Sequence, residues 1–333
     1  MNRTLGTLLS SYRCMETAST SAIKHLRQEK IVFSYKENKF ELNSLIEDTA
    51  PKGSDIATVI GIHGSPGSHN DWKYVIRMLS DTGIRFIGIN FPGYGSSDYD
   101  SRLTQDNQER VNYVQAVCDH LQADKNLIFV GHSRGTENAL KMAALNPQKT
   151  IGFVSANFVG LRTHVGVRPE WKFYLLHYLW QLGWTRVILR PILKFAYNFG
   201  AKLNVPTGDI AAWCVMAMLS SKFDLPGQLD YVKKVNESGV KSLLLYSGKD
   251  RFIEREIAEE MAEKFEKRTH LECDMKCGQD QDDHEIRKKV MDALGSDVNS
   301  VSVYFENEGH FLQKHRARLI ADGIVAMVKN HQK

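Results

Sequence analysis

The chain of 333 residues is expected to form an α/β fold, in which helices cover both faces of a mostly parallel, eight-stranded sheet. Short, nearly uniformly apolar segments recur along the chain, as they do in parallel strands that are buried on both faces. Segments with apolar residues at helical spacing alternate with them, which is the pattern of strand–helix–strand units. Turns rich in glycine, serine or asparagine directly follow several of the apolar segments.

The composition is that of a globular protein. Hydrophobic residues make up 42% and charged residues 25% of the chain, and its length can bury a large core. Basic side chains exceed acidic ones by 43 to 39, an excess too small to indicate nucleic-acid binding. No segment approaches the uninterrupted apolar length of a transmembrane helix, so none is expected.

The first 28 residues are predicted to be a tail that precedes the fold. Residues 1–15 contain Arg3 and Arg13, several Ser and Thr residues, and no acidic residue. This composition fits a disordered tail, which we favour, and also a mitochondrial transit segment. The expected location is therefore cytoplasmic, with a mitochondrial location as the alternative.

The five cysteines are odd in number and scattered, so no disulfide framework is predicted. Cys273 and Cys277 lie near His270 and His284, but their spacing matches no known zinc pattern. We expect solvated thiols in a polar insertion, residues 269–297, and no metal or organic cofactor.

Strands are predicted where apolar, β-branched or aromatic residues run between turn residues. A Glu-Asn-Lys turn joins the first two, which are expected to pair as a hairpin, and the later ones resemble buried parallel strands. The eight predicted strands are residues 31–35, 40–46, 57–62, 86–91, 127–130, 150–156, 242–246 and 300–305.

Helices are predicted where apolar residues recur at three- and four-residue spacing. One begins after Ser68, because serine and asparagine residues that can cap a helix precede the apolar pattern there. The others are residues 21–27, 104–121, 136–145, 229–237, 254–267, 282–294 and 312–329.

Residues 159–225 break the alternation, because they contain no clear strand. Aromatic residues crowd between Trp171 and Trp213, with basic residues interleaved. We predict a helical lid inserted into a core made by residues 29–158 and 226–333. The basic and aromatic stretch 171–199 is also a candidate for peripheral contact with a membrane surface.

The motif Gly-His-Ser-Arg-Gly at residues 131–135 connects a predicted strand to a predicted helix. This is the context of a nucleophile elbow, in which glycines leave room for a sharp turn and the serine hydroxyl stands free at the strand end. Ser133 is therefore the candidate nucleophile.

Five motifs together resemble the α/β-hydrolase fold superfamily, in its branch of lid-bearing serine hydrolases. The resemblance extends from about residue 31 to the C-terminus, and each motif follows a predicted strand. The motifs are His-Gly-Ser-Pro-Gly at 63–67, Phe-Pro-Gly-Tyr-Gly-Ser-Ser at 91–97, Gly-His-Ser-Arg-Gly at 131–135, Ser-Gly-Lys-Asp at 247–250 and Gly-His-Phe at 309–311.

A serine nucleophile needs a histidine to take its proton and an acid to orient that histidine. His310 fits the base because it lies between the last strand and the last helix. Asp250 follows the preceding predicted strand and matches the acid of the family, in the usual chain order serine, acid, histidine. The competing histidines fit the base less well, and they are His63, His132 and His315.

By the same resemblance, the backbone N–H groups of Ser65 and Arg134 are expected to bind the oxyanion of the tetrahedral intermediate. The oxyanion loop would consist of Ser65 with His63, Gly64, Pro66 and Gly67. For the Arg134 side chain, we favour a salt bridge over contact with an acidic substrate group.

The predicted activity is acyl transfer to water. Epoxide hydrolases and haloalkane dehalogenases of this fold use an aspartate nucleophile, and a serine at that position argues against both reactions. A carboxylesterase or lipase-like enzyme that acts on a lipophilic ester is favoured over amide, thioester or carbon–carbon bond cleavage. The alternative is a catalytically idle scaffold that binds a ligand or partner. No nucleic acid and no obligate protein partner is expected.

Overall fold

The computed structural model describes residues 25–275 and 280–333. The predicted tail therefore lies almost entirely outside the described residues. The first strand, β1 (Leu26–Tyr35), starts before the predicted boundary at residue 28. The last two residues of the helix predicted at 21–27 belong to this strand, because Leu26 and Arg27 pair with β2.

A single sheet of nine strands organises the molecule, in the order β1-β2-β4-β3-β5-β6-β7-β9-β8. The first two strands form an antiparallel hairpin, and β2 pairs antiparallel with β4. All the other pairs are parallel, which confirms the predicted class. The strands after β1 are β2 (Asn38–Asp48), β3 (Thr58–Ile62), β4 (Arg85–Gly88), β5 (Leu127–His132), β6 (Thr150–Ala156), β7 (Lys241–Ser247), β8 (Arg268–Cys273) and β9 (Ser300–Phe305).

The ninth strand corrects the prediction of eight. Strand β8 lies within the segment that was expected to be a polar insertion, and it pairs with β9 at the edge of the sheet. Most of its residues are partly exposed, in contrast to the buried central strands. Its sequence, Arg-Thr-His-Leu-Glu-Cys, therefore lacks the apolar run by which the other parallel strands were recognised.

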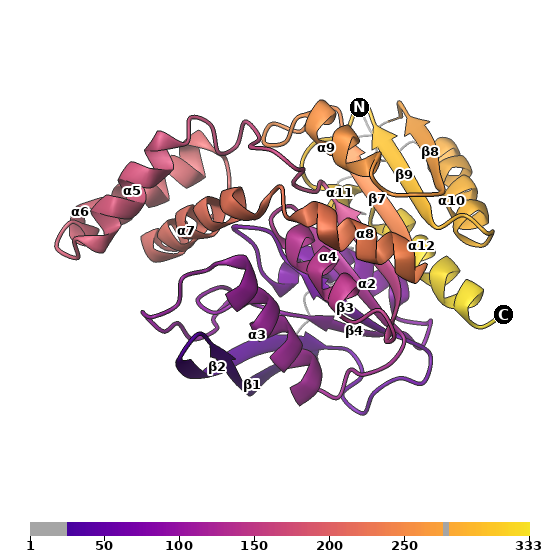
Figure 1. Ribbon diagram of the computed structural model, residues 1–333, viewed down its shortest axis with the longest axis horizontal. Coiled ribbons are helices and arrows are strands. Elements are labelled where there is room, and N and C mark those ends of the chain that lie inside the picture. The colour runs from indigo at the N-terminus through magenta and orange to yellow at the C-terminus, as the bar shows by residue number, and fades with distance from the viewer. Residues whose placement is uncertain (1–24, 276–279) are drawn as a thin grey trace, which may run out of the picture.

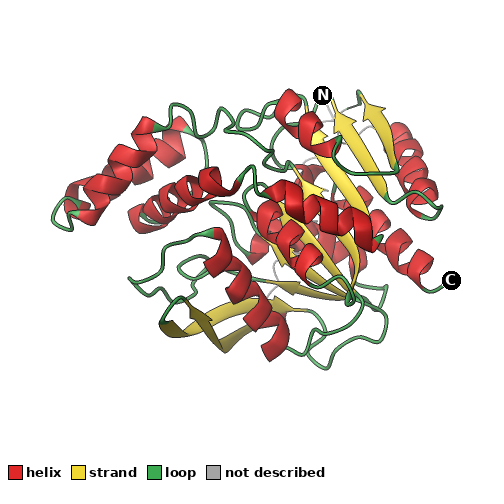
Figure 2. Ribbon diagram, in the orientation of Figure 1, coloured by secondary structure: helices red, strands yellow, loops and turns green. Residues whose placement is uncertain are grey.

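Helices cover both faces of the sheet, as Figure 2 shows in red and yellow. Alternate residues of the central strands serve two separate cores, so that Ile60 packs into one and Val59 into the other. The first core includes side chains of α3 (Asn107–His120), α4 (Gly135–Leu145), α8 (Gln228–Ser238) and α9 (Arg255–Ala262). The second includes side chains of α2 (Lys73–Leu79), α10 (Asp280–Leu294) and α12 (Ala317–His331). Burial on both faces explains why these strands are apolar throughout.

Helices also fill the segment that interrupts the alternation. They are α5 (Trp171–Gln181), α6 (Arg186–Phe195), the short π-helix η3 (Ala196–Gly200) and α7 (Gly208–Asp224). They share a small core of their own that includes Trp180, Leu193 and Val215. Figure 1 shows α5 and α6 at one end of the molecule, beyond the edge of the sheet. None of the helices in the described part of the chain is long and apolar enough to cross a bilayer.

Candidate active site

Ser133 sits in a tight turn between β5 and α4. Its φ angle is 51°, in the left-handed region that residues other than glycine rarely adopt. Its N–H donates to the carbonyl of Ala156 over 3.0 Å, and its carbonyl accepts from the N–H of Thr136 over 2.9 Å. These two bonds fix the strained turn, which holds the serine at the carboxyl edge of the sheet.

The glycines on either side of Ser133 are required by close backbone contacts. A Cβ on Gly131 would lie 2.6 Å from the Thr136 Cα atom. A Cβ on Gly135 would lie 2.4 Å from the carbonyl oxygen of His63 and 2.5 Å from that of Ile62. The start of α4 therefore packs against the end of β3 at a distance that only glycine permits.

We predict that Gly135→Ala lowers the free energy of unfolding by about 3 kcal/mol, because both contacts are with backbone that cannot rotate away. Urea denaturation followed by circular dichroism measures this. Gly200→Ala is the matched control, because a Cβ there meets nothing within 4 Å, and a change below about 1 kcal/mol is expected. Equal losses in both variants would contradict this account of the turn.

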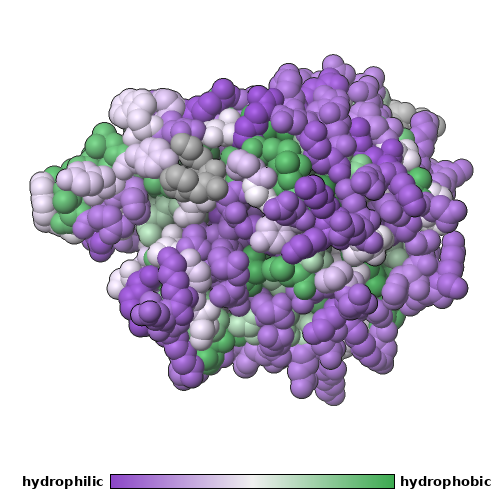
Figure 3. Space-filling view, in the orientation of Figure 1, coloured by the Kyte–Doolittle hydropathy of each residue, from purple (hydrophilic) through white to green (hydrophobic). Residues whose placement is uncertain are grey.

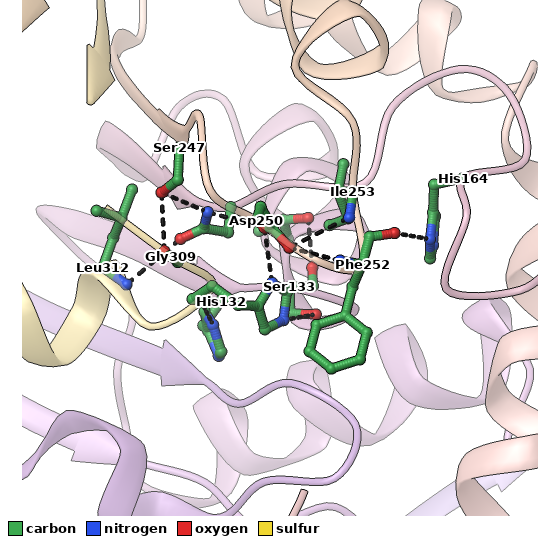
Figure 4. A network of polar contacts seen from close by, with 12 residues as sticks. His132, Ser133, His164, Ser247, Asp250, Phe252, Ile253, Gly309 and Leu312 are labelled. Atoms are coloured by element: carbon green, nitrogen blue, oxygen red, sulfur yellow. Dashed lines mark hydrogen bonds and ion pairs between the residues drawn. The ribbon is translucent and has the colours of Figure 1, made fainter. Parts of the chain in front are cut away.

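The structure brings Ser133, His310 and Asp250 into one hydrogen-bonded chain. His310 Nε2 lies 3.0 Å from Ser133 Oγ, and His310 Nδ1 lies 2.8 Å from Asp250 Oδ2. The three residues come from turns that follow β5, β9 and β7, so they meet at one edge of the sheet. Figure 4 shows this network from close by. The sequence prediction had grouped the same three side chains.

Asp250 is almost completely buried, yet it is well supplied with donors. Its Oδ1 accepts from the N–H groups of Phe252 and Ile253, over 2.8 and 3.2 Å. Its Oδ2 accepts from Asn157 Nδ2 over 3.0 Å, in addition to His310. Burial alone would raise the pKa of this carboxyl, but the interaction with His310 and the backbone donors lower it below its usual value. Asp250 is therefore ionised at neutral pH.

Burial lowers the pKa of His310 below the usual 6.5, although Asp250 acts in the opposite direction. The imidazole is therefore neutral at pH 7. Because the carboxylate can only accept, Nδ1 carries the proton and Nε2 offers a lone pair to the Ser133 hydroxyl. This is the protonation state that a general base needs.

Three residues that the sequence analysis had not selected hold this network in place. Asn157 bridges Asp250 and the hydroxyl of Ser247, and Ser247 donates in turn to the carbonyl of Gly309 over 2.9 Å. His164 Nδ1 donates to the carbonyl of Phe252 over 2.7 Å and so fixes the turn that contains Asp250. Asn157 and Ser247 both follow or end predicted strands, and Ser247 opens the Ser-Gly-Lys-Asp motif, but nothing in the sequence indicated which atoms they contact.

The other candidate bases are engaged elsewhere. His63 is fully buried, its Nδ1 donates to the carbonyl of Gly64, and its Nε2 accepts from the N–H of Phe91. Burial lowers its pKa to about 4, so it is neutral. His132 Nε2 donates to the carbonyl of His310 over 2.9 Å, which positions the base, and His315 pairs with Glu308.

The loop after β3 lies beside the serine. A Cβ on Gly64 would be 3.1 Å from the Cβ of Ser133, so the loop and the turn are in contact. Among the described residues, neither the N–H of Ser65 nor that of Arg134 has an acceptor. Ser65 and Pro66 line the same cavity as Ser133, whereas a Cβ on Gly67 would meet Asp71 of the 3-10 turn η2 (His69–Trp72). Two amide donors are thus free next to the nucleophile.

The side chain of Arg134 does not line the cavity. It is fully buried, with Nε donating to the carbonyl of Ala217 over 3.0 Å and Nη1 lying 3.4 Å from Glu137 Oε1. The ion pair is the alternative that the sequence analysis had favoured, and it leaves only the backbone N–H of Arg134 to face a substrate.

A cavity of about 610 Å³ opens above Ser133 and His310. Most of its lining residues belong to the segment 159–225, which includes α5, α6, η3 and α7, and the walls are largely apolar. The apolar lining includes Phe173, Leu176, Leu193, Leu203, Val215, Met218, Phe252 and Phe311. Arg168 and Lys172 are the basic residues of the lining. A cavity of this size accommodates a small organic molecule.

No group of three or more His, Cys, Asp or Glu side chains arranged to hold a metal ion occurs in the described ranges. His270 Nδ1 and the Ser302 hydroxyl share a hydrogen bond between β8 and β9. Cys273 is buried at the end of β8, so the expectation of a solvated thiol there was wrong. Cys277 lies outside the described residues.

Sequence comparison finds similarity that extends over most of the chain and similarity that is confined to about a third of it. An uncharacterized protein of Caenorhabditis elegans is 29% identical over 86% of this chain and 81% of its own length. A haloalkane dehalogenase of Mesorhizobium japonicum is 31% identical, but over only 32% of this chain and 34% of its own.

Among solved structures, a thermophilic esterase from Thermogutta terrifontis superposes with a TM-score of 0.59, at 15% identity, over 90% of this chain and 97% of its own. At this identity the likeness concerns the fold alone. The family described as "Alpha/beta hydrolase of unknown function (DUF1057)" matches residues 24–329, nearly the whole chain. The chain belongs to this family of alpha/beta hydrolases.

Proposed function

We propose that the protein is a serine hydrolase that transfers the acyl group of lipophilic carboxylic esters to water. The observation that carries this proposal is the continuous chain from Ser133 Oγ through the His310 imidazole to the Asp250 carboxylate, with links of 3.0 and 2.8 Å. Both distances are within hydrogen-bond reach, which is the geometry that base-assisted nucleophilic attack needs.

In the first half of the reaction, His310 Nε2 takes the proton of Ser133 as its oxygen attacks the ester carbonyl. The oxyanion that forms accepts hydrogen bonds from the free N–H groups of Ser65 and Arg134. Asp250 stabilises the imidazolium, which then gives its proton to the leaving alcohol. In the second half, His310 activates a water molecule that attacks the acyl-serine and restores the enzyme.

The serine favours this reaction over those of the partial relatives. Haloalkane dehalogenases and epoxide hydrolases of this fold attack with an aspartate, and both names occur among proteins that match about a third of this chain. Position 133 offers a neutral hydroxyl instead. A hydroxyl that loses its proton to His310 is suited to an acyl carbonyl.

The cavity supports a lipophilic substrate. Its lining includes eight Phe, Leu, Val and Met side chains. Burial of the apolar groups of a substrate against them is favourable. The segment 159–225 supplies most of the lining residues, which supports a lid that shapes the acyl site. We expect esters of medium or long acyl chains to react faster than acetates.

Labelling with a fluorophosphonate probe tests the proposal, because such probes phosphonylate serines that an adjacent histidine has activated. We expect stoichiometric labelling of the native protein at Ser133, identified by peptide mapping, and none after denaturation. Labelling at another serine would refute the assignment. The absence of labelling would favour the catalytically idle scaffold.

A further inference from the structure

Helix α6 and its flanking turns expose an unusual number of large apolar side chains. Trp184, Val187 and Phe199 are 72%, 74% and 70% exposed. Also exposed are Ile188, Ile192 and Phe195 on α6, Trp171, Tyr174, Leu175 and Tyr178 on α5, and Leu182 between the two helices. So many exposed apolar side chains on two consecutive helices indicate an interaction site rather than ordinary surface variation.

The exposed residues of α6 fall on one side of the helix. Within α6, at about 100° per residue, Val187, Ile188, Ile192 and Phe195 span an arc of about 140°. Leu189 and Leu193 point in another direction and are buried in the small core of this segment. The helix therefore has two apolar faces, and its neighbours in the fold cover only one of them. We refer to the exposed set on α6 and its flanking residues Trp184 and Phe199 as the α6 face.

The charge around the α6 face has one sign. From residue 171 to residue 208 the sequence contains no Asp or Glu and five basic residues. Arg190 pairs with Asp209. The other four have no carboxylate partner among the described residues, and they are Lys172, Arg186, Lys194 and Lys202. The basic side chains of α6 follow one flank of the exposed arc, since Arg186, Arg190 and Lys194 are spaced four residues apart.

The α6 face is also next to the cavity above Ser133. Leu193 and Ala196 line that cavity, whereas Ile192 and Phe195, their direct neighbours in sequence, are exposed. Only the thickness of one helix, about 10 Å, therefore separates the exposed face from the apolar chamber. Figure 3 shows apolar side chains in green at the end of the molecule that α5 and α6 form, with hydrophilic ones in purple beside them.

We infer that the α6 face binds the surface of a membrane that contains anionic phospholipids. An arc of aromatic and aliphatic side chains can enter the boundary between headgroups and acyl chains, while a basic flank contacts the headgroups. Of the four basic residues without a carboxylate partner, Lys172 lines the cavity. Anionic headgroups can pair with the other three in any arrangement, whereas a protein partner would have to present carboxylates at matching positions. This inference goes beyond the proposed hydrolysis and does not depend on the chemistry of Ser133.

Co-sedimentation with vesicles tests the inference on the full chain. We expect binding to vesicles of phosphatidylcholine mixed with phosphatidylserine, weakened by salt and by omission of phosphatidylserine. The triple variant Ile188→Gln, Ile192→Gln, Phe195→Gln should bind about 100-fold more weakly, because it removes apolar groups that would enter the lipid. Leu145→Gln is the matched control, since Leu145 is similarly exposed on α4 and should leave binding unchanged.

Two further measurements separate the outcomes. Ser133→Ala should bind vesicles as the wild type does, so loss of hydrolysis and loss of binding can be told apart. The triple variant should keep its circular dichroism and its activity on a short soluble ester. Equal vesicle binding by wild type and triple variant would overturn the inference. So would a concentration-dependent dimer that the triple variant abolishes while neither protein binds vesicles, because the α6 face would then be a contact between copies.

Discussion

Replacing Ser133 with alanine is expected to lower kcat for ester hydrolysis on the order of 10⁶-fold. The hydroxyl is the atom that forms the acyl-enzyme, and no other described hydroxyl accepts or donates at His310 Nε2. What remains should be the small rate that binding and the free amides of Ser65 and Arg134 provide. Hydrolysis of p-nitrophenyl esters of increasing chain length measures the loss.

The fold should survive this substitution. The bonds that hold the turn use the main chain of residue 133, so they persist in the alanine variant. Ser80→Ala, at an exposed serine that follows α2, is the matched control and should keep full activity. A Ser133→Ala protein that retains more than about a hundredth of the wild-type rate would show that the nucleophile lies elsewhere.

Asp250→Asn should lower kcat by about 10⁴-fold. The amide has nearly the same shape as the carboxylate, but its nitrogen is a donor. If that nitrogen faces His310 Nδ1, the imidazole proton moves to Nε2, and the lone pair that takes the Ser133 proton is lost. Asp55→Asn, at a fully exposed carboxylate, is the control and should leave kcat unchanged.

The pH dependence gives this prediction a second readout. The base must be neutral, and burial lowers the pKa of His310, so kcat/KM of the wild type should decline only below pH 6.5. Asp250 raises the pKa of His310, so its loss should lower that pKa further. The acid limb of the residual activity should therefore move to lower pH in Asp250→Asn. A shift to higher pH would contradict the assigned roles.

Much of the fold could be predicted because the residue types in each segment suit the place that the segment takes in the fold. The segment around Ser133 is the clearest case, since an apolar strand, two glycines and a helix-forming segment follow each other directly. The grouping of Asp250 with His310 rested on the resemblance to the family and on their places after two predicted strands, because the carboxyl ends of parallel strands meet at one edge of the sheet.

The features that were not predicted depend on contacts between distant segments, and the spacing of residues in the sequence does not encode such contacts. Strand β8 lies at a sheet edge, where one neighbour and solvent replace the two-sided burial that makes parallel strands recognisable. Asn157 offered no ionisable group to the sequence analysis, and only the fold reveals that its amide contacts Asp250. Likewise, the sequence of α6 does not show which of its two apolar faces is buried and which is exposed, because this depends on the helices that pack against it.

Asn157 also explains how the acid and the base keep their relative position although 60 residues separate them in the sequence. Its amide joins the ends of β6 and β7, and Ser247 extends the connection to Gly309, next to His310. The ends of the adjacent strands β6, β7 and β9 thus fix the distance between the Asp250 carboxylate and the His310 imidazole. The intervening β8 and α10 contribute to the sheet edge and to the second core, so the position of the reacting atoms does not depend on the length of the chain between Asp250 and His310.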